Sequence, residues 1–131
     1  MNKRPRKNRK PALLSVLALA LFISGCSRAD PPATPVQLAG NPHNGQHLIY
    51  TYACGSCHTI PGIAEATGTI GPNLSGFASR TYIAGSLINE PSNLYLWIAN
   101  PQKVVTGNAM PNLGVSEQQA RDIAAYLYTL R

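Results

Sequence analysis

The chain has 131 residues and a formal net charge of +6, from 11 lysine and arginine residues against 5 acidic residues. Six of the basic residues lie within the first ten positions, so the rest of the chain has five basic and five acidic side chains and no net charge. The total charge therefore gives no support to a nucleic-acid-binding role.

The first segment has the pattern of an export signal. After the basic residues an apolar run extends from Ala12 to Ile23, which is too short to span a bilayer as a stable anchor. The run ends in Ile23-Ser24-Gly25-Cys26, which resembles the bacterial lipobox, in which the cysteine is lipidated and begins the mature chain. We expect a lipoprotein signal peptide over residues 1–25, a lipid on Cys26 and a position on the periplasmic side of a bacterial membrane. A plain signal peptide or a retained anchor is the alternative.

Residues 26–42 are rich in proline and poor in bulky apolar side chains, with Asp30-Pro31-Pro32-Ala33-Thr34-Pro35 at their centre. Such a composition is typical of a semi-rigid tether, which at about 3.1 Å per residue reaches roughly 50 Å when extended. The remaining residues, 43–131, are predicted to form one compact domain.

Three helices and no strand are predicted in this domain. Asn44 is a candidate cap for a helix from Gly45 to about Cys54. A shorter helix is expected over residues 94–99, before Asn100-Pro101. Ser116 and Gln119 have the spacing of a capping box at the start of the last helix. The predicted class is all-α.

The motif Cys54-Gly55-Ser56-Cys57-His58 is typical of covalent c-type haem attachment. Two cysteines at this spacing can each form a thioether to a vinyl group, while the histidine reaches the iron. A thioredoxin-like pair would need a βαβ surround. A zinc site with His47 is conceivable, but adjacent Cys57 and His58 fit tetrahedral chelation poorly.

Further motifs follow in an order and spacing that resemble a class I cytochrome c. They are Gly45, Ile49, Tyr52, Gly71-Pro72-Asn73-Leu74, Trp97-Ile98-Ala99-Asn100-Pro101, Met110-Pro111 and Ala125-Tyr126-Leu127. The chain looks most similar to the single-haem domains of bacterial terminal oxidases and quinoprotein dehydrogenases. The resemblance implies one haem c in the core of a class I fold, with Gly45 of the first helix crossing closely against Tyr126 of the last.

Met110 is the candidate for the second axial ligand. It is the only methionine left once the signal is cleaved, and it lies in an irregular loop, 52 residues after His58. A distal thioether favours ferrous iron, and the resemblance implies the same His58 and Met110 pair. His43 and His47 remain alternatives, although both lie near the outer end of the first helix and are expected at the surface.

The resemblance also implies supporting roles. The carbonyl of Pro72 is expected to accept a hydrogen bond from the other ring nitrogen of His58, and Leu74 is expected to pack beside it. Trp97 and Arg80 are expected near the haem propionates, with core packing and a solvated arginine as the respective alternatives.

These features favour one-electron transfer rather than substrate chemistry. With His58 and Met110 as ligands both axial positions of the iron are expected to be filled, and the sequence has no second set of catalytic residues outside the haem site. The expected partners are redox proteins: a terminal oxidase, a cytochrome complex or a quinoprotein dehydrogenase. A membrane-tethered shuttle is the favoured interpretation. The alternatives are a fixed haem subunit of a membrane oxidase or dehydrogenase, and a haem sensor or peroxidase in which Met110 dissociates.

Overall fold

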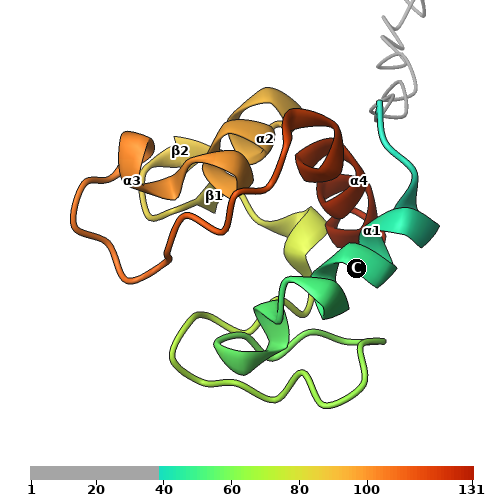
Figure 1. Cartoon of the computed structure of the whole chain (residues 1–131). Helices are drawn as coiled ribbons and strands as arrows, with labels where there is room; N and C mark the ends of the chain where they lie inside the picture. Colours follow the sequence, from blue (N-terminus) through green and yellow to red (C-terminus); the bar gives the residue numbers. More distant parts are fainter. Residues whose placement is uncertain (1–38) are drawn as a thin grey trace, which may run out of the picture. The chain divides into compact units, whose positions relative to one another are not determined.

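The computed structural model describes residues 39–131, so the predicted signal peptide, Cys26 and nearly all of the tether lie outside the described residues. The elements in chain order are α1 (Pro42–Thr51), the 3-10 turns η1 (Cys54–Ser56) and η2 (Phe77–Ser79), β1 (Tyr82–Ile83), β2 (Leu87–Ile88), α2 (Pro91–Ala99), α3 (Pro101–Val104) and α4 (Glu117–Leu127). Helices and loops dominate, and α1 packs across α4 (Figure 1), which confirms the predicted class and helix crossing. Over residues 39–131, no helix combines the length and the hydropathy that a membrane crossing requires.

Helix α1 begins earlier than predicted. Asn41, not Asn44, is its cap, because the Asn41 side chain accepts hydrogen bonds from the backbone N–H groups of His43 and Asn44 at 2.9 and 3.3 Å. Pro42 fits the first helical position, where its missing N–H costs nothing. The backbone N–H of Asn41 also donates to the buried carboxylate of Asp122 at 2.8 Å. The start of α1 is therefore tied directly to α4.

The end of α1 also differs from the prediction of one helix that continues to about Cys54. The helix stops at Thr51, and Ala53 takes a left-handed conformation with φ 51°. Cys54–Ser56 then form a separate 3-10 turn. The haem motif therefore begins on a separate 3-10 turn, and Cys57 follows directly after it, so the two cysteines do not lie on a continuation of α1.

Helix α4 begins with the predicted capping box. The Ser116 side chain accepts from the backbone N–H of Gln119 at 3.3 Å, and the Gln119 side chain accepts from the backbone N–H of Ser116 at 2.9 Å. With the exception of Arg121, every residue from Ala120 to Leu127 is buried. This prediction is confirmed.

The closest approach of Gly45 to α4 lies at Asp122 and Ile123, about one turn before the predicted contact residue Tyr126. A Cβ atom added at Gly45 would lie 2.6 Å from the carbonyl carbon of Asp122 and 3.1 Å from the Cα atom of Ile123. Tyr126 instead donates its hydroxyl hydrogen to the carbonyl of Pro61 at 2.7 Å. The hydrogen bond from the Asn41 backbone to Asp122 ties the start of α1 to this same part of α4.

The middle of the domain contains more regular structure than predicted. Helix α2 ends at Ala99 as expected but begins at Pro91, three residues before the predicted start, and Pro101 then starts the short helix α3. Strands β1 and β2 pair antiparallel, with Tyr82 opposite Ile88. Strands of two residues are too short to leave a periodic pattern in the sequence.

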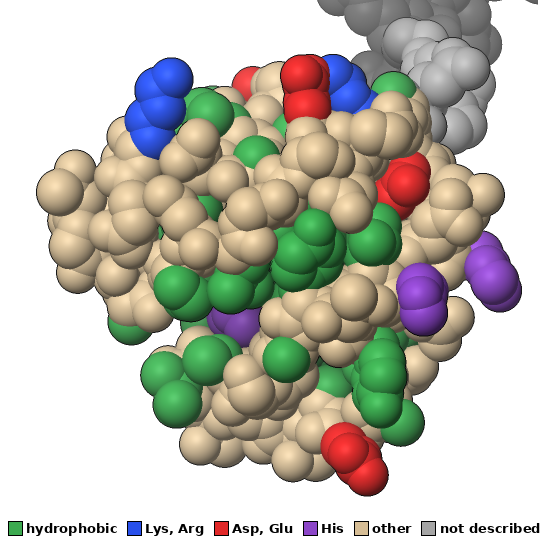
Figure 2. Space-filling view, in the orientation of Figure 1, with side chains coloured by type: hydrophobic (Ala, Val, Ile, Leu, Met, Phe, Trp, Pro, Cys, Tyr) green, Lys and Arg blue, Asp and Glu red, His purple; other side chains and the backbone are tan. Residues whose placement is uncertain are grey.

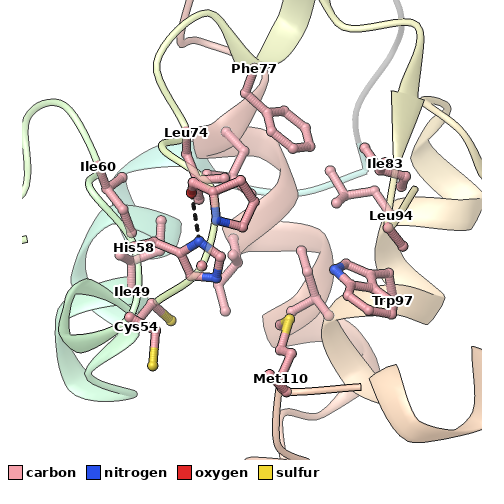
Figure 3. Close-up of a pocket in the computed structure, with 18 of the residues that line it drawn as sticks. Ile49, Cys54, His58, Ile60, Leu74, Phe77, Ile83, Leu94, Trp97 and Met110 are labelled. Atoms are coloured by element: carbon pink, nitrogen blue, oxygen red, sulfur yellow. Dashed lines mark hydrogen bonds between the residues drawn. The ribbon is translucent and has the colours of Figure 1, made fainter. Parts of the chain in front are cut away.

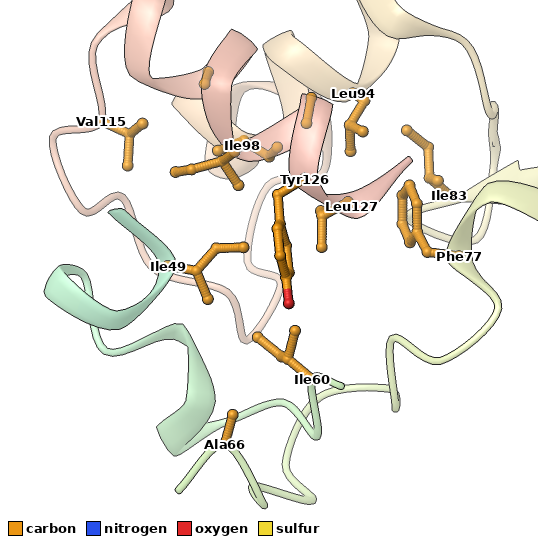
Figure 4. Close-up of a cluster of buried hydrophobic side chains, with 13 residues drawn as sticks. Ile49, Ile60, Ala66, Phe77, Ile83, Leu94, Ile98, Val115, Tyr126 and Leu127 are labelled. Carbon is orange, nitrogen blue, oxygen red and sulfur yellow. The ribbon is translucent and has the colours of Figure 1, made fainter. Parts of the chain in front are cut away.

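A single cluster of buried apolar side chains joins the helices (Figure 4). Its members are Ile49, Ile60, Ala66, Phe77, Ile83, Leu94, Ile98, Val115, Ala120, Ile123, Ala124, Tyr126 and Leu127. Phe77 and Tyr128 add an edge-to-face pair with ring centroids 5.9 Å apart. The cluster packs two parts of the chain onto α4: residues 60–66, which follow the cysteines, and the hairpin formed by β1 and β2.

Tyr128 at the end of α4 is expected to make unfolding depend on alkaline pH. Its hydroxyl donates to the side chain of Asn89 at 2.9 Å, and Asn89 donates to the carbonyls of Phe77 and Arg80, each at 3.0 Å. Burial raises the pKa of Tyr128 to about 12, with smaller contributions from Tyr95 and Glu90. The unfolded chain releases this proton near pH 10 and the folded chain only near pH 12. The contribution of Tyr128 to the free energy of unfolding is therefore fully present below pH 10 and is lost between pH 10 and pH 12.

Denaturant unfolding of the haem-loaded protein from pH 8 to 12 measures this effect. We expect Tyr128→Phe to lower the free energy of unfolding at pH 8 by about 1 kcal/mol. The decline above pH 10 should also become shallower, but not vanish, because burial raises the pKa of Tyr126 as well. An unchanged slope in Tyr128→Phe would contradict the assignment.

Candidate haem site

A cavity of about 700 Å³ opens between α1 with the loop that follows it, the hairpin, α2, α4 and the loop before α4. Its volume lies in the range of small-molecule sites. Figure 2 shows hydrophobic side chains gathered along a hollow with a histidine in its depth. The cavity wall includes all eight predicted haem-site residues: Cys54, Cys57, His58, Pro72, Leu74, Arg80, Trp97 and Met110.

His58 is held in one orientation by the loop that contains Pro72. Its Nδ1 lies 2.8 Å from the Pro72 carbonyl oxygen, which accepts the ring N–H and leaves Nε2 free toward the cavity (Figure 3). The same loop is fixed to the haem motif, because the backbone N–H of Gly71 donates to the Cys57 carbonyl at 2.7 Å. A Cβ atom added at Gly71 would lie 2.6 Å from Nδ1 of His58. Only glycine permits this approach.

The backbone around the two cysteines forms a tight turn. The backbone N–H groups of Cys57 and His58 both donate to the Cys54 carbonyl, at 3.2 and 3.0 Å. Burial raises the pKa of the Cys54 thiol; Cys57 adds to this rise, and a backbone hydrogen bond opposes it. A thioredoxin-like pair needs a lowered thiol pKa, so this environment argues against that alternative.

Met110 reaches the opposite wall of the cavity from the loop between α3 and α4. Figure 3 shows its sulfur directed into the cavity, across from His58. Two amide side chains that were not predicted as site residues, Gln102 and Asn108, hold this loop. Gln102 donates to the carbonyls of Asn108 and Met110 at 2.9 and 2.8 Å, and the Asn108 side chain accepts from the backbone N–H of Met110 at 2.7 Å. In the sequence, the one feature that could have pointed to them is their place near Gly107, in the segment that leads to Met110.

Trp97 and Arg80 flank the cavity. The Trp97 indole nitrogen faces into it (Figure 3), and within residues 39–131 this N–H makes no hydrogen bond. The Arg80 guanidinium donates to the carbonyls of Asn73 and Ser75 and lies 5.4 Å from the centre of the Phe77 ring. Arg80 therefore supports the loop that orients His58.

The alternative ligands lie elsewhere. His43 and His47 are exposed on α1 and line a separate surface depression. Over residues 39–131, no group of three or more His, Cys, Asp or Glu side chains is placed to hold a metal ion, so the zinc alternative has no support there. Two thiols, one imidazole and one thioether on the wall of an apolar cavity fit a covalently bound haem.

A family model described as cytochrome c matches residues 43–131. The chain belongs to the cytochrome c family. Members of this family carry covalent haem c, and Cys54 and Cys57 supply the CxxC of the attachment motif. A cytochrome c domain is typically an electron carrier.

Two kinds of cytochrome c relative are found. Cytochrome c2 of Rhodopila globiformis is 33% identical over 105 residues, which cover 70% of this chain and 95% of that protein. Cytochrome c oxidase subunit 2 of Alkalihalophilus pseudofirmus is 34% identical over 90 residues, or 68% of this chain and 25% of the relative. The corresponding subunit of Bacillus subtilis is 35% identical over 83 residues, which cover 58% and 23%. The chain thus spans about a quarter of these oxidase subunits.

Proposed function

We propose that this cytochrome c carries single electrons through one haem c that is attached at Cys54 and Cys57 and ligated by His58 and Met110. The main support is the placement of the His58 imidazole and the Met110 sulfur on opposite walls of one apolar cavity (Figure 3). When bound, the haem supplies a one-electron iron couple, and a methionine ligand raises its potential.

The residues of the chain prepare this site in three ways. The bond from His58 to the Pro72 carbonyl fixes the imidazole and increases its basicity as a ligand. Gln102 and Asn108 fix the backbone of Met110. The apolar lining limits the access of water. We assign Trp97 and Arg80 to the haem propionates, and Leu74 to packing beside the imidazole.

Absorption spectra of the oxidised and reduced protein test the ligand pair. The wild type is expected to show low-spin haem c and the weak near-infrared band of iron–methionine ligation. Met110→Ala should lose this band and lower the reduction potential, because the distal thioether favours ferrous iron. Leu113→Ala, which changes a cavity residue of the same loop, is the matched control and should keep the band.

A missing band in the wild type, with haem c attached, would overturn the proposed pair. Carbon monoxide binding to the ferrous wild type would then indicate an open distal site and favour the sensor or peroxidase alternative. Its absence would indicate a different second ligand.

We further propose that lipidation at Cys26 tethers the protein to the periplasmic side of a membrane. After residue 25 the chain has no net charge and one lysine, Lys103, so strong electrostatic steering to an acidic partner is not expected. A tether would instead raise the local concentration of a partner in the same membrane, such as a terminal oxidase, a cytochrome complex or a quinoprotein dehydrogenase.

A fixed haem subunit of a membrane complex is the second candidate. The similarity to cytochrome c oxidase subunit 2 favours it, because the haem domain is part of a larger chain in those relatives. Mild detergent extraction separates the two candidates. A shuttle should purify alone, whereas a fixed subunit should purify in constant ratio with other chains.

A further inference from the structure

Two histidines on α1 are not used by the haem site. His43 and His47 are four residues apart on this helix, and both are exposed. They line a surface depression of about 380 Å³ together with Gln46, Tyr50 and the loop residues 62–64. Two histidine side chains stand out from the surface over α1 in Figure 2.

Neither imidazole has another structural role within residues 39–131. The side chains of His43 and His47 make no hydrogen bond and no ion pair there; the hydrogen bonds with the side chains of Asn41 and Thr51 involve only backbone groups of the two histidines. No lysine, arginine or carboxylate lines the depression. Both rings are therefore free to bind a ligand, and no positive side chain in the depression repels a cation.

Their spacing suits chelation of one metal ion. Residues four apart on a helix have Cβ atoms about 5–6 Å apart, so two imidazoles can converge on one ion with metal–nitrogen distances of about 2.0–2.1 Å. The positive end of the helix dipole opposes a cation near His43, but the effect is confined to the first turn, and His47 lies beyond it.

We propose that His43 and His47 form a second metal site, separate from the haem, that takes a divalent transition-metal ion of the borderline class. Both ligands are imidazole nitrogens, which suit Cu²⁺ and Zn²⁺, and water completes the coordination shell. Cu²⁺ binds more tightly than Zn²⁺ at such nitrogen ligands. This site does not depend on the ligands proposed for the haem iron.

Metal titration of the haem-loaded full chain tests the site, with Zn²⁺ followed by calorimetry and Cu²⁺ by electron paramagnetic resonance of the oxidised protein. We expect one ion per chain and a Cu²⁺ spectrum with coupling to imidazole nitrogens. His43→Gln and His47→Gln should each weaken binding at least about tenfold, because loss of a direct ligand costs no less than loss of an outer partner.

Gln46→Ala is the matched control, since it alters the same depression but removes no imidazole, and it should bind as the wild type does. Glutamine favours helix more than histidine does, so both histidine variants should keep α1 and an unchanged haem spectrum. The site is wrong if the wild type binds neither ion, or if either histidine variant binds as tightly as the wild type.

Discussion

Gly71→Ala is expected to lower haem attachment and to disturb the ligation of the iron by His58. The added Cβ atom would lie 2.6 Å from Nδ1 and 2.8 Å from Nε2 of His58, far inside van der Waals contact. Either the imidazole or the loop must move, and both movements break the hydrogen bond from His58 to Pro72. Overpacking of this kind costs about 1–3 kcal/mol, and sometimes more.

The measurements for Gly71→Ala are the haem content per chain, the near-infrared ligand band and the denaturant midpoint. Thr69→Ala is the control, because Thr69 is an exposed residue of the same loop whose side chain makes no hydrogen bond within residues 39–131. Wild-type haem content and ligand band in Gly71→Ala would show that the loop adjusts freely and that the approach of Gly71 to His58 is not required.

Gly45→Ala is expected to destabilise the whole domain by separating α1 from α4. In an isolated helix alanine is about 1 kcal/mol more favourable than glycine, so helix propensity predicts a gain. The added Cβ atom, however, would lie 2.6 Å from the carbonyl carbon of Asp122 in the backbone of α4. Backbone atoms at a helix crossing are displaced less easily than the end of a flexible side chain. We therefore expect the free energy of unfolding to fall by about 2 kcal/mol or more.

The free energy of unfolding of the haem-loaded protein in guanidinium measures this loss. Asn44→Ala is the matched control, since Asn44 is the exposed neighbour of Gly45 on α1, and its change should stay within about 0.5 kcal/mol. A stabilised Gly45→Ala would mean that helix propensity outweighs the crossing and that α1 and α4 are not held at this register.

Local signals in the sequence were sufficient to predict the haem attachment motif and part of the fold. The haem motif at residues 54–58 is contiguous, so its meaning needs no tertiary structure. The capping box of Ser116 and Gln119 acts within four residues, and α4 begins where it predicts. For motifs that lie far apart in the sequence, the family resemblance predicted that they belong to one site. All eight predicted haem-site residues do line one cavity.

Only the tertiary structure decided how these pieces meet. The close approach of Gly45 to Asp122, and the bond from the Asn41 backbone to the Asp122 carboxylate, join residues about 80 positions apart. The amides of Gln102 and Asn108 take their roles from the path of the loop around them. Capping and covalent attachment depend on neighbouring residues, whereas close approaches between backbones depend on the packing register, which the whole core sets at once.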